Sequence, residues 1–199
     1  MSFTAGVVGV QGDVSEHADA VERAAAAHGN DPEIRTIRES GIVPDCDVLL
    51  LPGGESTTIS RLLHREGIAP EIRAHVDADK PVLATCAGLI VAAADANDDR
   101  VNELDLLDVS VERNAFGRQR DSFEAPLAVD GLDEPFHAVY IRAPIVEAVG
   151  EDVEVLATWD GNPVAVRDGP VLGTSFHPEL TPDTRIHDLA LFEGPVAES

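Results

Sequence analysis

Short apolar runs alternate with amphipathic stretches through the first half of the chain. The apolar runs are rich in β-branched residues and have the length of strands, whereas the stretches between them have helical composition. This alternation predicts parallel strands linked by helices, in a sheet covered on both faces. Ser15 is expected to cap the first helix and Gly29 to end it. The expected strands are residues 5–10, 33–37, 47–52 and 81–85, and the expected helices are residues 15–29, 57–67, 70–79 and 89–96.

The second half of the chain consists of short strands divided by turn residues, followed by one closing helix at 185–194. We therefore predict an α/β fold with three layers, in which helices cover both faces of a mainly parallel sheet and antiparallel strands are added to it. No repeat or linker marks a boundary, so residues 1–199 are expected to form a single domain. The expected strands are residues 108–113, 123–129, 136–144, 153–159, 163–169 and 171–176.

The charge balance is strongly acidic. Aspartate and glutamate number 37 against 14 lysine and arginine residues, which gives a net charge of -23. This charge repels nucleic acid and anionic membranes, and it strains the folded state unless salt screens it. We therefore expect a salt-adapted protein with no nucleic-acid or membrane partner. The N-terminus has no basic signal segment, and the uncharged stretch at 81–94 is shorter than the roughly 20 residues that span a bilayer, so we expect a cytoplasmic protein.

Two cysteines, Cys46 and Cys86, are too few for a disulfide framework. Cys46 is assigned to the core. Cys86 lies in VLATCAGLIV, where an expected strand runs through a turn of small residues into an expected helix. That order places the thiol at the carboxyl end of a strand and the N-terminus of a helix, as in a nucleophile elbow, where the thiolate is favoured. A lone cysteine in such a run is more often an ordinary core residue.

Among the seven histidines, His177 is the best candidate for a base that serves Cys86. It follows the expected strand 171–176 and so lies at the edge of the sheet where Cys86 is expected. Glu179, two residues further on, can orient the imidazole. His137 opens an expected strand. The remaining histidines lie in charged helical stretches and are expected on solvated faces: His17, His28, His64, His75 and His187.

The segment LPGGESTT at 51–58 places two glycines between a strand and a helix. Such a loop can turn its backbone N–H groups towards a ligand, or the glycines can serve the turn alone. The segment lacks the lysine of a phosphate-binding P-loop, and the chain lacks the second cysteine pair of a zinc deaminase. We therefore expect no metal and no cofactor.

Together these motifs resemble the class I glutamine amidotransferases, which have an α/β domain with a cysteine elbow and a later H-x-E. More closely, the chain resembles the glutaminase subunits of pyridoxal 5′-phosphate synthase, from about residue 6 to about 192. The matching motifs are GVQGDVSEH, LPGGESTT, TCAGLI, ERNAFGRQRDSFE, YIRAP and GTSFHPEL.

The resemblance implies a catalytic triad, in which Cys86 attacks the side-chain amide of L-glutamine, His177 acts as base and Glu179 orients it. It further implies an oxyanion hole formed by backbone N–H groups of Gly54 and Ala87, with Gln11 nearby. The glutamine-binding positions that it implies are Gly54, Glu55, Ser56, Arg113, Ile141 and Arg142. Arginine suits a carboxylate because its planar fork can bind both oxygens.

One position departs from the family's pattern. The elbow is usually G-x-C-x-G, but here the first glycine is Ala84. An alanine fits if its φ is negative, whereas a positive φ adds strain of about 1 kcal/mol or more.

The resemblance also implies a partner, a (βα)₈ synthase subunit that receives ammonia from the glutaminase and activates it on contact. Three alternatives remain at this stage. The chain could serve another synthase, such as the imidazole glycerol phosphate enzyme, although RNAFGRQ and YIRAP speak against this. It could be a catalytically silent binding module, against which the intact triad argues. It could also be a cysteine hydrolase that acts on peptides, for which the sequence gives no groove signal.

Overall fold

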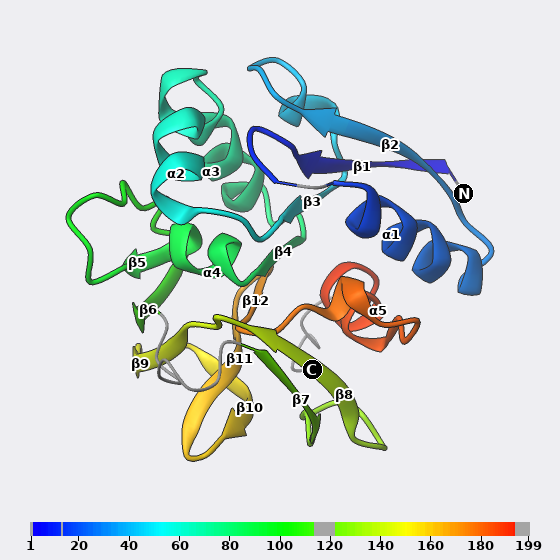
Figure 1. Ribbon diagram of the computed structural model, residues 1–199. Helices are drawn as coiled ribbons and strands as arrows, with labels where there is room; N and C mark the ends of the chain where they lie inside the picture. Colours follow the sequence, from blue (N-terminus) through cyan, green and yellow to red (C-terminus); the bar gives the residue numbers. More distant parts are fainter. Residues whose placement is uncertain (1, 13, 114–121, 194–199) are drawn as a thin grey trace.

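A seven-stranded sheet forms the centre of the protein (Figure 1). The computed structural model describes residues 2–12, 14–113 and 122–193. The strands of the central sheet are β1 (Ser2–Val8), β2 (Asp31–Ile37), β3 (Val48–Leu51), β4 (Val82–Thr85), β10 (Glu154–Trp159), β11 (Asn162–Asp168) and β12 (Val171–Thr174). Their order is β10-β11-β12-β4-β3-β1-β2. The five strands from β12 to β2 are parallel, and β10 and β11 are added antiparallel. The predicted mainly parallel sheet with antiparallel additions is therefore confirmed.

Helices cover both faces of this sheet, as predicted. On β3, Val48 and Leu50 belong to one buried cluster and Leu49 and Leu51 to the other, because successive side chains of a strand point to opposite faces. The first cluster includes residues of α1 (Ser15–Ala27) and α5 (Arg185–Leu191), and the second includes residues of α2 (Ser56–Arg65), α3 (Ala69–Asp77) and α4 (Ala87–Ala92). Figure 1 shows the two groups of helices on opposite sides of the strands.

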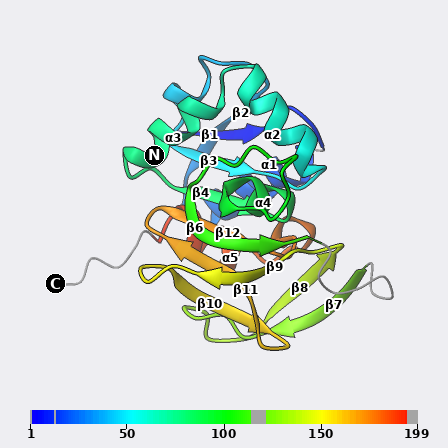
Figure 2. The ribbon, with the colours of Figure 1, turned by 90° about the vertical axis from the view of Figure 1, so that its left-hand side faces the viewer.

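The second half of the chain adds two small sheets. One contains β5 (Ala93–Asp95), β6 (Leu107–Glu112) and β9 (Ile145–Val149), and the other pairs β7 (Ser122–Leu127) with β8 (Phe136–Ile141). In Figure 2, β7, β8 and β9 occupy the lower part of the molecule together with β10 and β11. Each small sheet contributes buried residues to one of the two clusters. The sheets therefore cover the part of the central sheet that the helices leave open.

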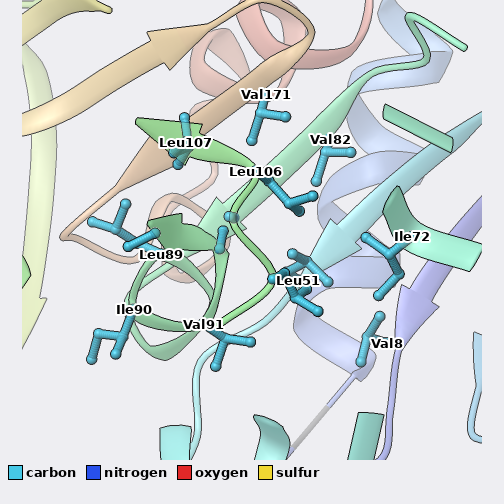
Figure 3. Packing of buried hydrophobic residues seen from close by; sticks show 14 of the residues in the cluster. Val8, Leu51, Ile72, Val82, Leu89, Ile90, Val91, Leu106, Leu107 and Val171 are labelled. Carbon is cyan, nitrogen blue, oxygen red and sulfur yellow. The ribbon is translucent and has the colours of Figure 1, made fainter. Parts of the chain in front are cut away.

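The core on the α2–α4 side is built from residues of both halves of the chain. Figure 3 shows Val82 of β4 close to Val171 of β12, with Leu106 between this pair and Leu51 of β3, and Leu89 of α4 on the side of Leu107. Complete burial of such a side chain contributes roughly 1.5–3 kcal/mol to stability. The strand–turn–helix unit that carries Cys86 is therefore anchored in the core on both sides of the turn.

Three local expectations are corrected by the structure. The helix expected at 89–96 ends at Ala92 and continues as strand β5. Strand β9 was not predicted, although its sequence IVEAV is mostly apolar; three of its five residues are exposed in the structure. Ser15 is the first helical residue and not the cap, since the cap position is Val14, without a side-chain hydrogen bond. Gly29 follows the end of α1 with φ +68°, as expected of a glycine that ends a helix.

The parallel strands bring the loops of interest to one edge of the sheet. The loops after β1, β3, β4 and β12 contain Gln11, Gly54, Cys86 and His177, in that order. The ends of β3, β4 and β12 are level, with Leu51 opposite Ala84 and Thr174 opposite Thr85. Chemical groups that are far apart in the sequence are thereby placed around one point. In the described part of the chain, no helix has the length and apolar character to cross a membrane.

Candidate active site

A pocket of about 360 Å³ opens at this edge of the sheet. It gathers every residue that the sequence analysis assigned to the active site except Glu179, and it adds Ile90, which that analysis did not identify. The lining residues are Gln11, Gly54, Glu55, Ser56, Cys86, Ala87, Ile90, Arg113, Ile141, Arg142 and His177. The loops after β1, β3, β4, β6 and β12 contribute to it, together with the end of β8 and the first turns of α2 and α4.

Cys86 occupies a sharp turn between β4 and α4. Its backbone has φ 52° and ψ -108°, a conformation that side-chain-bearing residues rarely adopt. The Cys86 N–H donates to the Thr174 carbonyl at 2.8 Å, which fixes the turn to β12. The thiol is 9% exposed, and its Sγ lies 3.8 Å from the Ile141 carbonyl oxygen. The strained turn holds the sulfur at the wall of the pocket, as in a nucleophile elbow.

The neighbours of Cys86 explain which small residues the elbow requires. A Cβ at Gly88 would overlap the Leu51 carbonyl oxygen of β3, so only glycine allows this approach. Ala84 lies within β4, fully buried, and its φ is not positive. The strain considered for an alanine at this position therefore does not arise. The positive φ belongs to Cys86 itself.

The helix after Cys86 is shorter than expected. It comprises six residues, Ala87–Ala92, where the sequence analysis expected a helix through residue 96. The macrodipole of so short a helix is small, so it gives the thiolate less support than we expected. The charge partner of the sulfur is instead His177.

His177 and Glu179 form the rest of the predicted triad arrangement. His177 lies three residues after the end of β12 at Thr174, and its N–H donates to the Val139 carbonyl at 2.8 Å. The imidazole Nδ1 lies 2.6 Å from Glu179 Oε1. Glu179 sits in a short 3-10 turn, Pro178–Leu180, with only 4% of its side chain exposed. The carboxylate thus supports His177 from behind, while His177 reaches the pocket.

The electrostatics of this pair favour a charged imidazole. Burial alone would lower the pKa of His177, but hydrogen bonds with Cys86 and Glu179 more than offset this and raise the pKa to about 10. For Glu179, burial would raise the pKa of the carboxyl, but hydrogen bonds from His17 and His177 hold that pKa well below its ordinary value. Near neutral pH the arrangement therefore favours an imidazolium between a carboxylate and the sulfur.

Three histidines that were expected on solvated faces are buried. His17 of α1, His75 of α3 and His187 of α5 are 2%, 4% and 0% exposed, so that expectation was wrong for them. Their helices are amphipathic, but each of these histidines falls on the face that packs inward. His17 is the most consequential, because its Nε2 lies 3.3 Å from Glu179 Oε1. The position of His17 among the buried Ala20, Val21 and Ala24 was the available signal in the sequence.

Glu55 is another residue that lines the pocket. Its side chain caps α2 by accepting hydrogen bonds from the N–H groups of Thr57 and Thr58. The Thr57 hydroxyl and these N–H groups lower the pKa of Glu55 to about 2. Glu55 Oε1 also lies 3.3 Å from Arg113 Nη2, and Asp98, which the sequence analysis did not identify, lies 2.5 Å from Arg113 Nη1. The Arg113 guanidinium is therefore held in place from two sides.

Two backbone positions near the pocket are also unusual. Gly54 has φ +141°, and a Cβ there would overlap Gln11 Oε1, which accepts a hydrogen bond from the Glu55 N–H at 2.9 Å. Gln11 thus holds the loop after β3. Arg142 has φ 44°, directly after Ile141 at the end of β8. Both residues line the pocket.

Part of one sequence motif lies outside the described residues. Residues 114–121 of ERNAFGRQRDSFE belong to that part, so the motif is represented here by its two ends, including Arg113. Within residues 2–12, 14–113 and 122–193, no three His, Cys, Asp or Glu side chains are grouped in a way that could hold a metal ion.

Nearly the whole chain is similar to known glutamine amidotransferases. The model of the SNO glutamine amidotransferase family matches residues 7–193. The pyridoxal 5′-phosphate synthase subunit PdxT of Haloarcula marismortui is 76% identical over 194 residues, which cover 98% of each chain. PdxT of Halobacterium salinarum is 70% identical over 193 residues, or 97% of this chain and 95% of the relative.

Solved structures resemble the whole chain. A crystal structure described as a glutamine amidotransferase is 44% identical and has a TM-score of 0.84, with 93% of this chain and 95% of the other covered. A PurLQS structure from Thermotoga maritima covers 90% of this chain with a TM-score of 0.57 at 20% identity, a likeness of fold alone.

Proposed function

This chain belongs to the SNO glutamine amidotransferase family, and on that premise we propose that it is the glutaminase subunit of a pyridoxal 5′-phosphate synthase. It hydrolyses L-glutamine to glutamate and ammonia, and the ammonia is used in the synthesis of pyridoxal 5′-phosphate. The observation that carries the proposal is the identity of 76% to PdxT of Haloarcula marismortui across nearly the whole of both chains. We take residues 1–199 as one glutaminase domain, because both buried clusters share the central sheet.

We assign the chemical step to Cys86, His177 and Glu179. The Cys86 thiolate adds to the amide carbon of glutamine, and the carbonyl oxygen becomes an oxyanion. The imidazolium of His177 then gives its proton to the leaving nitrogen, so that ammonia departs and a thioester remains. Water attacks the thioester with His177 as base, which releases glutamate and restores the thiolate. Glu179, at 2.6 Å from His177 Nδ1, keeps the ring oriented and stabilises its charge throughout.

We assign substrate recognition to the remaining lining residues. Arg113 and Arg142 are the cations of the pocket, and a guanidinium suits the α-carboxylate of glutamine. Glu55, Ser56 and Ile141 complete the walls around the amino-acid part of the substrate. Backbone N–H groups of Gly54 and Ala87 are assigned to the oxyanion. Gln11 supports that hole by fixing the Gly54 loop through its hydrogen bond to the Glu55 N–H.

We assign the ammonia to a (βα)₈ synthase subunit that binds this chain. Free ammonia would be protonated in water, so transfer through a closed interface preserves the nucleophile. With a net charge of -23, the chain is not expected to bind nucleic acid or an anionic membrane. We place the reaction in the cytoplasm, where a reducing environment keeps Cys86 a thiol.

The test measures glutamate release from glutamine at molar KCl, with and without the (βα)₈ synthase subunit. We expect release that requires the partner and is abolished by Cys86→Ala. Release that persists in Cys86→Ala would overturn the assignment of the nucleophile. Activation by an imidazole glycerol phosphate synthase subunit instead would redirect the proposal to that enzyme.

A second reagent separates an active site from a silent module. A glutamine-analogue electrophile should label Cys86 covalently, and glutamine should protect it. Absence of labelling, together with absence of glutamate release in the presence of the partner, would favour a binding module that kept the fold.

A further inference from the structure

A second histidine contacts the triad from behind. His17 lies in the first turn of α1, on the face that packs against the Pro178–Leu180 turn. Its Nε2 is 3.3 Å from Glu179 Oε1, the same oxygen that lies 2.6 Å from His177 Nδ1. The side chains of His17 and Glu179 are 3% and 4% exposed, so water contributes little to this contact. One carboxylate oxygen therefore accepts from two imidazoles.

We propose that His17 is a positioning residue for glutamine hydrolysis, which donates Nε2–H to Glu179 and so keeps the carboxylate charged and aimed at His177. The inference rests on the proposed glutaminase function. The other carboxylate oxygen, Glu179 Oε2, is buried without a hydrogen-bond partner among the described residues. Without His17, the carboxylate would have His177 as its single donor, and burial would favour its protonated form. A protonated Glu179 supports the His177 imidazolium poorly, and the Cys86 thiolate loses its counter-ion.

The contacts of His17 indicate which ring nitrogen donates a hydrogen bond. Its Nδ1 is buried and has no hydrogen-bond partner among the described residues. A charged imidazolium would leave an N–H without an acceptor at Nδ1, whereas the neutral ring with its proton on Nε2 leaves only a lone pair there.

The test uses substitutions that move one donor. His17→Gln places an amide nitrogen near the position of Nε2, His17→Asn places it near Nδ1 and out of reach of Glu179, and His17→Leu removes it. His187→Leu is the matched control, because it also replaces a buried histidine. His187 belongs to α5, and its ring nitrogens have no hydrogen-bond partner among the described residues. Each variant is studied at molar KCl with the (βα)₈ synthase subunit present.

The decisive measurement is the pH profile of Cys86 alkylation by iodoacetamide, which reports the thiolate and requires no turnover. The acidic limb of the profile is the pH range in which alkylation falls because the thiol becomes protonated. We expect this limb to move up by about one pH unit in His17→Leu and His17→Asn. At a pH below the limb, the thiolate fraction would then be about tenfold lower than in the parent. In His17→Gln and His187→Leu the limb should stay within about 0.3 unit of the parent. In turnover, kcat should fall about tenfold in the Leu and Asn variants with KM within about twofold.

Other results would overturn the proposal. Identical alkylation profiles in His17→Asn and His17→Gln, with only the melting temperature lowered, would make His17 a packing residue. If His17→Leu does not fold, the Asn and Gln pair decides the question alone. If the parent protein releases no glutamate while the alkylation profiles still differ as expected, the glutaminase function fails and the positioning of the Cys86–His177–Glu179 set stands.

Discussion

At the scale of single residues, Cys86 combines a strained backbone with a charged neighbour. Its φ of 52° costs of order 1–3 kcal/mol, which the packing of β4 and α4 must offset. The N–H···O=C bond to Thr174 and the contact of Gly88 with the Leu51 carbonyl hold the turn in this form. The strained backbone places the sulfur at the pocket and next to His177, which is the position that a nucleophile requires.

Substitution of Ala84 by glycine tests whether the alanine strains the turn that holds Cys86. Ala84→Gly restores the pattern usual in the family. It also removes a buried methyl group and increases the conformational entropy of the unfolded chain. We expect the free energy of unfolding to fall by about 1–2 kcal/mol and kcat to stay within about twofold. Denaturant titration and glutamate release measure the two quantities. A clear rise in kcat would mean that the alanine does hold the elbow under strain.

The buried histidine of α5 predicts a loss of stability in acid. Burial lowers the pKa of His187 to about 4, whereas in the unfolded chain its pKa is near the ordinary value of 6.5. The unfolded state therefore binds more protons between these pH values, so this contribution is complete above 6.5 and is lost as the pH falls towards 4. We expect His187→Leu to reduce the loss of unfolding free energy between pH 7 and pH 4 by roughly 3 kcal/mol at most.

Denaturant titrations at both pH values, at constant KCl, measure this difference. The control is His137→Leu, because that side chain is largely exposed and paired with Glu124 on the surface. Equal acid sensitivity in the parent, in His187→Leu and in the control would contradict the assignment.

At the scale of elements, the parallel strands position the site and the connecting helices complete it. Strands β3, β4 and β12 end level with one another, which places Gly54, Cys86 and His177 around the same pocket. Helix α1 adds His17 from the other face of the sheet, behind Glu179. The elements closest to the chemistry are short, since α4 has six residues, and their placement depends on packing against neighbours.

The close approach of α4 to β3 can be tested at Gly88. Gly88→Ala would drive a methyl group into the Leu51 carbonyl oxygen, which is backbone and cannot rotate away. We expect the free energy of unfolding to fall by about 3 kcal/mol or more and the elbow to lose activity. Gly29→Ala is the comparison, because it has open space but a positive φ, and it should cost only about 1 kcal/mol. Thermal melting compares the two variants; equal losses would argue against the steric account.

At the scale of the whole molecule, the dominant feature is a net charge of -23. Many of the ion pairs within the described residues are exposed, such as Arg35–Glu33 and Arg65–Glu66, and such pairs contribute about 0–1 kcal/mol each. Screening therefore removes little attraction, whereas it relieves repulsion that acts over the entire surface. The relatives of this chain in Haloarcula marismortui and Halobacterium salinarum are consistent with a protein that works in concentrated salt.

We expect the melting temperature to rise by about 5–10 °C between 0.1 M and 2 M KCl, which corresponds to a gain of roughly 2–3 kcal/mol for a chain of this size. Sucrose at matched osmolality is the control for effects that do not depend on charge. A melting temperature that is flat or falls with KCl would contradict the account of self-repulsion.

The sequence by itself determined the fold class and proposed the chemistry, because both depend on local information. Apolar runs set the strands, and the positions of Cys86 and His177 at strand ends follow from their neighbours in the chain. The tertiary structure decided which faces are buried. It placed His17 and His187 inside, because the docking of α1 and α5 on the sheet selects those faces, and it brought His17 to Glu179 across nearly the whole chain. It also set the ends of α4 and β9, since their lengths depend on packing and not on local propensity.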